Sequence, residues 1–370
     1  MNSFRDRFEE LLSCADVRIN GERSWDLQVH NEKFYSRTLA QGSFGLGESY
    51  VDGWWDCNRL DEFFHLILRA KLYEKVKPWK GVINVVTAKL YNRQNRNRAF
   101  QVGEQHYDIG NDLYRCMLDD RMIYSCGYWQ SASCLDEAQE TKLDLVCRKL
   151  NIKPGMRVLD VGCGWGGTAK FIAENYHAEV VGITVSQKQA QLAKEQCKGL
   201  PVDIRLQDYR TLDESFDRIL SIGMFEHVGH KNYQEYMRAV RRNLNDDGLF
   251  LLHTIGRNRT AASTDTWLDR YIFPNYMIPS SSQISAVAEG VFVLEDWHNF
   301  GADYDKTLIK WFHNFDRSWP TLKSDYGERF YRMWKYYLLS CAGSFRARKN
   351  HVWQIVFSLG GVQGGYVAPR

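Results

Sequence analysis

The chain has 370 residues, 44% of them hydrophobic and 25% charged, which is enough to bury a large core and to form two domains. Its net charge of +3 is too small to indicate a nucleic-acid-binding protein. The nine cysteines are irregularly spaced and include no Cys-x-x-Cys pair, so the sequence favours neither a disulfide framework nor a metal site.

The amino terminus is charged and lacks the apolar stretch of a signal peptide. No window approaches the roughly 20 consecutive apolar residues that a membrane-spanning helix needs. We therefore expect a cytoplasmic protein with reduced cysteines, whose contact with the inner face of the membrane is peripheral. Aromatic residues make up 14% of the chain, which suits either a dense core or a surface that handles lipid.

Residues 1–100 are predicted to form a smaller, mostly helical domain. The apolar residues of the segment 60–68 recur at the i, i+3, i+4, i+7 spacing of an amphipathic helix. Between Arg59 and Arg98, ten Lys and Arg residues stand against three Asp and Glu residues, a local excess of +7. Such a segment suits an anionic membrane surface, although a solvated helical face has the same composition. A second apolar stretch, 82–91, leads into the polar tail 92–98, which we interpret as a linker.

Residues 101–370 are predicted to form an α/β catalytic domain. Short β-branched runs alternate with helical segments, which is the pattern of a doubly wound parallel sheet. The predicted strands are 157–161, 179–183, 203–206, 217–220 and 249–253, with helices near 166–176, 187–197 and 231–243 and further strand candidates at 291–295 and 352–357. The aromatic-rich region 257–345 is too long for loops. We expect it to form helices that cover the substrate.

A glycine-rich loop, 159–167, follows the first of these strands. It contains Asp160, Gly162, Cys163, Gly164, Gly166 and Gly167. Such glycines let the backbone approach a ligand, and the helix that follows offers free N–H groups. The spacing also fits the dinucleotide pattern G-x-G-x-x-G, and a purely structural turn is a third interpretation. Asp160 lies just before the first glycine, as in loops that bind S-adenosylmethionine, and the next strand ends at Thr184 without a ribose-binding acid. We therefore favour S-adenosylmethionine.

Several further motifs lie outside this loop. They are Gly45–Trp55, His106–Asp112, Tyr124–Trp129, Gln207–Arg210, Gly223–His227, Leu252–Gly256 and Asn299–Tyr304. Together with the glycine loop, they resemble the family of bacterial cyclopropane-fatty-acyl-phospholipid synthases and, more distantly, the mycolic acid cyclopropane synthases. The resemblance extends over nearly the whole chain. The glycine loop alone is general to methyltransferases, whereas the combination of motifs is specific.

The resemblance implies a Rossmann-like class I S-adenosylmethionine-dependent methyltransferase fold behind an N-terminal domain that engages lipid. It also implies a homodimer that acts on unsaturated acyl chains of membrane phospholipids. The residues that match the family's cofactor site are Tyr124, Ser125, the loop 159–167, Thr184, Gln189, Asp208 and Tyr209. Gln189 would recognise the ribose in place of the missing acid.

The implied reaction places demands on the site. An isolated alkene is a weak nucleophile, and its attack on the sulfonium methyl leaves a carbocation that must lose a proton before the ring closes. A dry aromatic pocket would exclude water and stabilise the cation by about 2 kcal/mol. In the family the base is a bound bicarbonate ion, and the matching ligands are Cys126, Glu226, His253, the backbone N–H of Ile255 and Tyr304. A carboxylate can accept the bicarbonate O–H, and the other groups can donate to its oxygens.

Each of these residues also has an ordinary structural interpretation. Cys126 and Tyr304 fit a hydrophobic core, Glu226 fits the first turn of a helix, and His253 fits a buried strand. Two other functions fit the sequence as well: methylation of an amine, and lipid binding without catalysis. The sequence leaves open the headgroup, the acyl and double-bond positions, a cyclopropane or methyl-branched product, and the roles of Gly45–Trp55 and His227.

Overall fold

The computed structural model describes residues 4–75, 110–261 and 263–370. These residues form two compact units. The first unit contains 4–75, 263–274 and 304–350, and the second contains 110–261, 275–303 and 351–370. The boundary predicted near residue 100, the apolar stretch 82–91 and the polar tail 92–98 lie outside the described residues.

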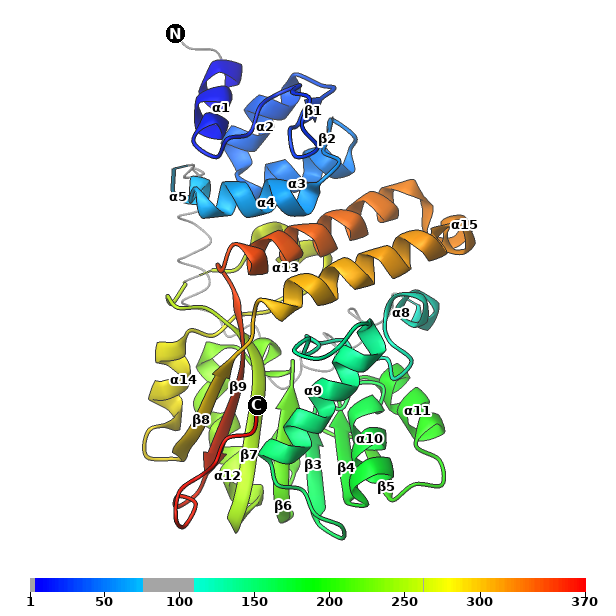
Figure 1. Cartoon of the computed structure of the whole chain (residues 1–370), viewed down its shortest axis with the longest axis vertical. Helices are drawn as coiled ribbons and strands as arrows, with labels where there is room; N and C mark the ends of the chain where they lie inside the picture. The colour runs from blue at the N-terminus through cyan, green and yellow to red at the C-terminus, as the bar shows by residue number, and fades with distance from the viewer. Residues whose placement is uncertain (1–3, 76–109, 262) are drawn as a thin grey trace. The chain divides into compact units, whose positions relative to one another are not determined.

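A seven-stranded sheet forms the centre of the second unit, in the order β5-β4-β3-β6-β7-β9-β8 (Figure 1). The strands are Arg157–Val161 (β3), Glu179–Thr184 (β4), Val202–Leu206 (β5), Phe216–Ile222 (β6), Leu244–Gly256 (β7), Val293–Asn299 (β8) and His351–Ser358 (β9). All predicted strands are therefore present. The sheet is mixed rather than wholly parallel, because β9 runs antiparallel to both β7 and β8. Hydrophobic periodicity marks a strand but does not encode its direction.

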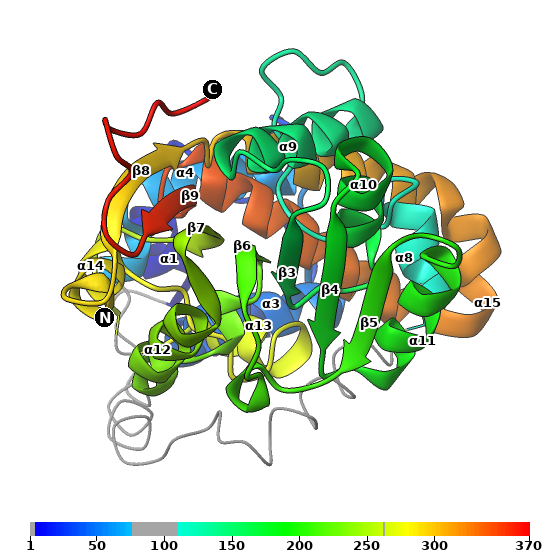
Figure 2. The same ribbon diagram turned by 90° about the horizontal axis from the view of Figure 1, so that it is seen from below.

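Helices cover both faces of this sheet (Figure 2). Helices α9 (Leu135–Lys149), α10 (Gly167–Tyr176) and α11 (Gln187–Gln196) pack on one face, and α12 (Tyr233–Asn243) and α14 (Ser281–Ala288) pack on the other. Successive strand residues alternate between the two cores, so that Val158 joins the first and Leu159 joins the second. Because both faces are covered, the strands have nearly continuous apolar sequences.

Local side-chain caps fix where two of these helices begin. Ser186 Oγ accepts the N–H of Gln189 at 3.3 Å at the start of α11. Ser280 Oγ accepts the N–H of Gln283 at 3.1 Å, and the Gln283 side chain accepts the N–H of Ser280 at 2.9 Å, which is a capping box at the start of α14. The shorter helices are α8 (Asn111–Met117), η1 (Tyr209–Thr211), η2 (Phe225–His227) and η3 (His230–Asn232).

The first unit is mostly helical. It contains α1 (Phe4–Ser13), α2 (Lys33–Gln41), α3 (Ser43–Val51), α4 (Leu60–Arg69), α5 (Leu72–Lys75), α13 (Thr266–Tyr271), nearly all of α15 (Asp303–Arg346), and the antiparallel pair β1 (Gln28–Val29) and β2 (Trp55–Asp56). Helix α15 is interrupted at Gly327, where φ is 74°. The helices expected within 257–345 are thus present, whereas their role as a substrate cover stays a prediction.

Helix α3 gives part of the Gly45–Trp55 motif a structural role. A Cβ at Gly45 would lie 2.4 Å from the carbonyl oxygen of Arg37, and a Cβ at Gly47 would lie 2.6 Å from the Trp267 ring. Both glycines therefore permit close packing of α3 on its neighbours. The amphipathic helix predicted at 60–68 is α4, which confirms that prediction.

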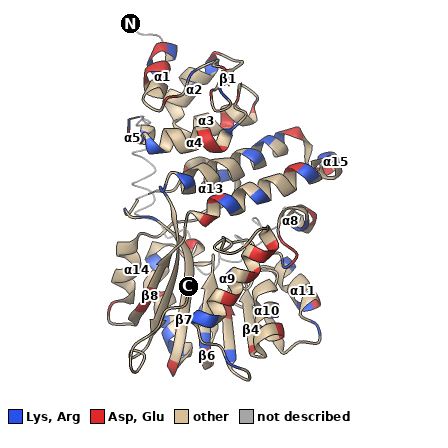
Figure 3. Cartoon of the chain, viewed as in Figure 1, with Lys and Arg blue, Asp and Glu red and all other residues tan. Residues whose placement is uncertain are grey.

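Charged residues of both signs occur along α15 (Figure 3). Near its end, Arg346 forms ion pairs with Asp61 at 2.8 Å, Glu62 at 2.7 Å and Asp305 at 2.9 Å. These pairs connect the end of α15 with its own beginning and with α4. Within the described ranges, no helix is long and apolar enough to cross a membrane.

Candidate active site

The predicted site residues of the second unit gather at the carboxyl ends of its parallel strands. The strand order changes direction between β3 and β6, which is the point where ligands bind in open α/β sheets. The segments that follow these strands carry the glycine loop, Gln189, Asp208 and Tyr209, and Glu226. Thr184 is the last residue of β4, and Ile255 lies near the end of β7. His253 lies within β7.

The glycine loop has a backbone that favours glycine. Gly162, Gly164 and Gly166 have φ values of 86°, 54° and 85°, in the left-handed region that side chains disfavour. Gly167 begins α10, and a Cβ there would lie 2.1 Å from the carbonyl oxygen of Arg121. Among the residues that the structure describes, apart from the chain neighbours of Gly164, no atom lies within 4 Å of a Cβ built at Gly164. The loop therefore has room for a ligand at Gly164, next to the start of a helix.

Asp160 is a buried carboxyl near the end of β3. Burial raises its pKa to about 7, and the opposing charge of Lys142 lowers it. Its Oδ2 atom has no hydrogen-bond partner among the described residues. Burial also raises the pKa of Cys163 well above its ordinary value, so this thiol stays protonated. Asp160, rather than Cys163, is therefore the side chain of the loop whose charge can change near neutral pH.

Thr184 and Gln189 are both buried and lie close together. The Thr184 hydroxyl donates to the Gln189 side-chain oxygen at 3.1 Å. This bond fixes the orientation of the Gln189 amide, so that its nitrogen can donate to another group. The pair therefore fits a hydroxyl-bearing ligand at the end of β4.

Asp208 and Tyr209 lie at the start of η1. Asp208 accepts the N–H of Arg210 at 2.9 Å and pairs with its guanidinium at 3.2 Å. The Tyr209 ring lies 5.1 Å from the Tyr236 ring, and burial raises the pKa of Tyr209 to about 12. Both residues are therefore held in defined positions.

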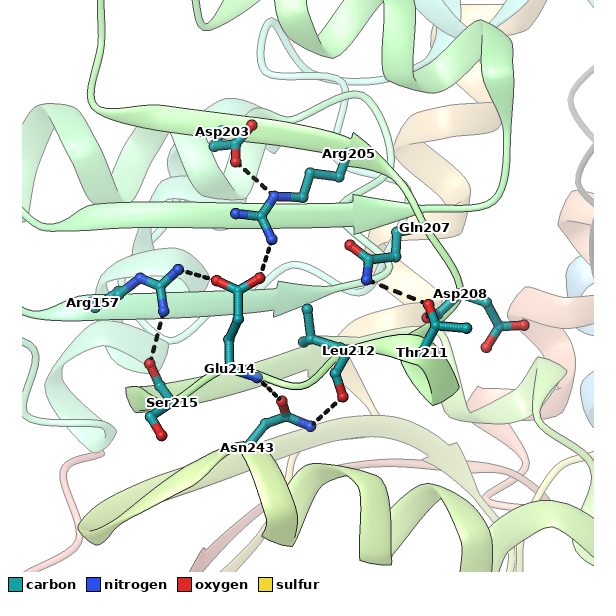
Figure 4. Close-up of polar contacts among 10 residues, drawn as sticks. All are labelled: Arg157, Asp203, Arg205, Gln207, Asp208, Thr211, Leu212, Glu214, Ser215 and Asn243. Atoms are coloured by element: carbon teal, nitrogen blue, oxygen red, sulfur yellow. Dashed lines mark hydrogen bonds and ion pairs between the residues drawn. The ribbon is translucent and has the colours of Figure 1, made fainter.

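The connection between β5 and β6 is anchored by polar contacts just before β6 begins (Figure 4). Glu214 forms ion pairs with both Arg157 and Arg205. Its N–H donates to the Asn243 side-chain oxygen at 2.8 Å, and the Asn243 nitrogen donates to the Leu212 carbonyl at 3.3 Å. These contacts restrict the segment that carries Asp208.

The segment 124–126 packs beside α9. The Tyr124 ring lies 5.2 Å from the Tyr114 ring. Ser125 and Cys126 are buried, and the Cys126 thiol contacts the carbonyl oxygen of Gly127 at 3.2 Å. Lys142 donates to the Ser125 hydroxyl at 3.1 Å. Ser125, which is predicted to bind the cofactor, and Cys126, which is predicted to bind bicarbonate, therefore both lie in a buried segment.

Glu226 lies in η2, and its side chain turns toward the end of β7. Its Oε1 atom accepts the N–H of Ile255 at 2.7 Å, whereas Oε2 is buried and has no hydrogen-bond partner among the described residues. Burial raises the pKa of Glu226 to about 7, and the Ile255 N–H partly offsets that effect. Two predicted ligands, Glu226 and Ile255, are therefore in direct contact with each other. Burial also lowers the pKa of the neighbouring His227 to about 4, so His227 is neutral at physiological pH.

His253 is buried in β7 next to the Phe300 ring, at 5.7 Å. The amide nitrogen of Gln354 lies 3.4 Å from its Nδ1 atom. Burial lowers the pKa of His253 well below its ordinary value, and Lys142 and Lys149 lower it further. A neutral ring that accepts at Nδ1 carries its proton at Nε2, which is then a donor.

Tyr304 belongs to the first unit, unlike the other predicted ligands. Its ring packs against Trp311 at 5.8 Å and Phe345 at 4.6 Å. Its membership of the ligand set stays a prediction.

Three buried polar residues near the site were missing from the sequence-based set: Gln139, Lys142 and Gln354. None of them has exposed surface. Gln139 and Lys142 lie on the buried side of α9, among Leu135, Ala138 and Leu143. Polar residues at apolar positions of a helix were the signal that could have identified them.

Comparison with known proteins gives concordant results. Residues 94–355 match the model of the mycolic acid cyclopropane synthetase family. The chain is 53% identical to the cyclopropane-fatty-acyl-phospholipid synthase of Escherichia coli over 360 residues, which are 97% of this chain and 94% of that protein.

Solved structures confirm the predicted fold. The cyclopropane synthase MmaA2 from Mycobacterium tuberculosis matches with a TM-score of 0.67 and 29% identity, over 70% of this chain and 97% of that one. The mycolic acid cyclopropane synthase CmaA1, in complex with SAH and CTAB, matches with a TM-score of 0.66 and 32% identity, over 70% of this chain and 97% of that one. The second unit is therefore a class I methyltransferase fold, and the chain belongs to the mycolic acid cyclopropane synthetase family.

Proposed function

We propose that this chain transfers a methylene group from S-adenosylmethionine to the cis double bond of unsaturated acyl chains in membrane phospholipids. The 53% identity to a cyclopropane-fatty-acyl-phospholipid synthase supports this substrate class, because it extends over 97% of the chain. The observation that carries the chemistry is Glu226, a buried carboxyl with one oxygen bonded to Ile255 and the other without a partner in the described part of the chain.

The residues of the second unit fit S-adenosylmethionine. The open position at Gly164 offers space, and the ordered amide of Gln189 offers a donor for a ribose hydroxyl. Within the ranges that the structure describes, one oxygen of the Asp160 carboxyl has no hydrogen-bond partner, which suits a ligand that carries N–H groups. The methionine-derived part of the cofactor carries an ammonium group of this kind.

The donors and acceptors at the end of β7 fit bicarbonate as the general base. The free Oε2 of Glu226 needs a donor, and the bicarbonate O–H is one. The Nε2–H of His253 and the thiol of Cys126 would donate to its oxygens. The Ile255 N–H already donates to Glu226 Oε1, so a bicarbonate oxygen would have to share that donor.

Each protein group then has a defined task. When bound, S-adenosylmethionine supplies the methyl group, and bicarbonate removes the proton that leaves before the ring closes. Glu226 holds the base in place by accepting its O–H. His253 stays neutral because it is buried, and therefore donates without adding positive charge beside the cation. The buried setting of Cys126, at 0% exposure, excludes water that would trap a carbocation.

We further propose a peripheral contact with the membrane and a homodimer. The basic segment that starts at Arg59 supports the membrane contact, since anionic headgroups attract Lys and Arg residues. Light scattering of the purified protein, with and without anionic vesicles, tests both ideas. A monomer that stays separate from the vesicles would contradict them.

The direct test is incubation with S-adenosylmethionine and vesicles of a monounsaturated phospholipid, followed by mass analysis of the acyl chains. We expect each modified chain to gain one CH₂ unit and to lose its double bond. Unchanged lipid together with methylation of added amines would favour an amine methyltransferase instead.

The bicarbonate proposal has its own arm in this assay. Buffers stripped of carbon dioxide should slow the unaltered protein, and added bicarbonate should restore its rate. The Glu226→Gln variant should respond weakly to both changes. An unaltered protein with equal rates in stripped and supplemented buffer would contradict the proposal.

A further inference from the structure

We propose that Gln139 and Lys142 of helix α9 are positioning residues, which hold the segment 123–126 at the cofactor loop. This inference rests on the cofactor site proposed above. Both side chains are fully buried, and both donate hydrogen bonds to Ser125.

Hydrogen bonds from α9 hold this segment at successive positions. The Gln139 amide nitrogen donates to the carbonyl oxygen of Ser125 at 2.8 Å and to that of Ile123 at 3.4 Å. Lys142 Nζ donates to the Ser125 hydroxyl at 3.1 Å. The N–H of Tyr128 donates to the carbonyl oxygen of Ala138 at 2.9 Å. Gln139 therefore fixes the backbone of Ser125, and Lys142 fixes its side chain.

The opposite end of the segment is held by Asp119. Its carboxyl accepts the N–H of Ile123 at 2.9 Å and the N–H of Arg121 at 3.1 Å. Arg121 is also the residue whose carbonyl oxygen lies against Gly167. The segment therefore connects Asp119 and α9 with the start of α10 at the glycine loop. A displacement of Ser125 would consequently move the backbone that packs against Gly167.

Lys142 is the charged centre of this arrangement. Burial lowers its pKa, and Asp119, Cys126, Asp160 and Cys147 raise it. Asp160 responds in the opposite sense, because Lys142 lowers its pKa against the effect of burial. His253 also faces this charge, which helps to keep its ring neutral. A fully buried lysine is costly unless nearby groups stabilise its charge, and Asp119 and Asp160 both act in that sense.

The chain offers a matched control on the same helix. Lys149 is also fully buried, but it pairs with Asp296 at 3.3 Å and contacts His298 at 3.1 Å, on strand β8. Its loss should destabilise the protein without affecting the cofactor loop. The variants Lys142→Met and Lys149→Met thus remove the same charge from two places on one helix.

The test is the affinity for S-adenosylhomocysteine, measured by calorimetry between pH 5.5 and 9 without lipid. Lys142→Met should weaken binding about tenfold, because the Ser125 hydroxyl loses its donor. Lys142→Arg should restore most of the affinity, because it keeps a charged donor at this position. Gln139→Leu should weaken binding by a similar factor, because the Ser125 carbonyl loses its donor.

Two outcomes would overturn the inference: an unchanged affinity in a folded Lys142→Met variant, or an equal loss of affinity in Lys149→Met. Near-ultraviolet circular dichroism confirms folding, and a variant that unfolds is replaced by Lys142→Gln with the same criteria. The measurement does not involve lipid. A protein that binds the cofactor and loses affinity in Lys142→Met, but forms no ring in the vesicle assay, would support this inference and refute the proposed substrate.

Discussion

Glu226 combines deep burial with an incomplete set of hydrogen bonds. One oxygen accepts the Ile255 N–H at 2.7 Å, and the other has no partner among the described residues. Its pKa rises from 4.5 to about 7 because burial disfavours the charge. The folded state therefore binds this proton more tightly than the unfolded state. The contribution of Glu226 to stability is therefore greatest below about pH 4.5 and is lost as the pH rises to about 7.

Replacing this carboxyl should separate stability from activity. Glutamine keeps the oxygen that accepts the Ile255 N–H but carries no charge. We expect Glu226→Gln to be more stable than the unaltered protein at pH 8 by about 1–3 kcal/mol, and equally stable at pH 5. Its kcat should fall about 10²–10⁴-fold. Urea unfolding at both pH values measures the first effect, and a variant that is less stable at pH 8 would contradict the account.

At this scale the sequence identified most of the polar groups but not their contacts. Glu226, His253 and Cys126 were expected from the resemblance, and the structure shows that all three are buried, whereas their catalytic roles stay predictions. The bond between Glu226 and Ile255 was not expected. Gln354 was missed, because its contact with His253 joins strands far apart in the chain and has no local sequence pattern.

The glycine loop illustrates how one element constrains its neighbours. Gly164 has a positive φ, and none of the described residues beyond its chain neighbours comes within 4 Å of a Cβ built there. A Cβ at Gly167, by contrast, would lie 2.1 Å from the carbonyl oxygen of Arg121. Gly164 therefore favours glycine because of its left-handed backbone conformation. Gly167 favours glycine because a side chain there would clash with the Arg121 carbonyl. Their substitutions should therefore fail in different ways.

We expect Gly164→Ala to cost about 1 kcal/mol of stability through its left-handed backbone, and to weaken cofactor binding strongly. Gly167→Ala should cost more, about 2–4 kcal/mol, because a backbone carbonyl must move. Urea unfolding and calorimetric binding compare the two variants side by side. Equal loss of stability, with cofactor affinity retained in Gly164→Ala, would refute this assignment of roles.

Secondary structure was largely predictable because its signals are local. The strands around the glycine loop, such as β3 and β4, follow from runs of buried apolar residues. The start of α11 follows from its Ser186 cap. The direction of β9 was not predictable, because antiparallel pairing with β7 and β8 is decided by the path of the chain through α15.

The two units are interleaved along the chain. In the sequence, the segments 263–274 and 304–350 of the first unit alternate with segments of the second unit. Their helices, α13 and α15, join the helices of residues 4–75 in the first unit. Trp267 of α13 lies 4.6 Å from the ring of Tyr336 in α15, and Arg346 of α15 pairs with α4. The predicted division at residue 100 treats the amino-terminal part as separate, whereas its packing partners lie far later in the sequence.

Truncation should therefore affect more than the deleted segment. We expect removal of residues 1–75 to expose α13 and α15, because it removes Asp61, Glu62 and the aromatic side chains that bury them. Limited proteolysis with mass analysis should then find new cleavage sites within 263–274 and 304–350. A truncated protein in which these segments resist protease would show that they fold without the amino-terminal helices.

In the proposed reaction, the transferred carbon loses a proton before the ring closes. Reaction with S-adenosylmethionine that carries a trideuterated methyl group measures this loss on the product. We expect acyl chains that gain CD₂, with one deuterium lost to solvent. Acyl chains that retain all three deuterium atoms, or that gain nothing, would contradict the proposed reaction.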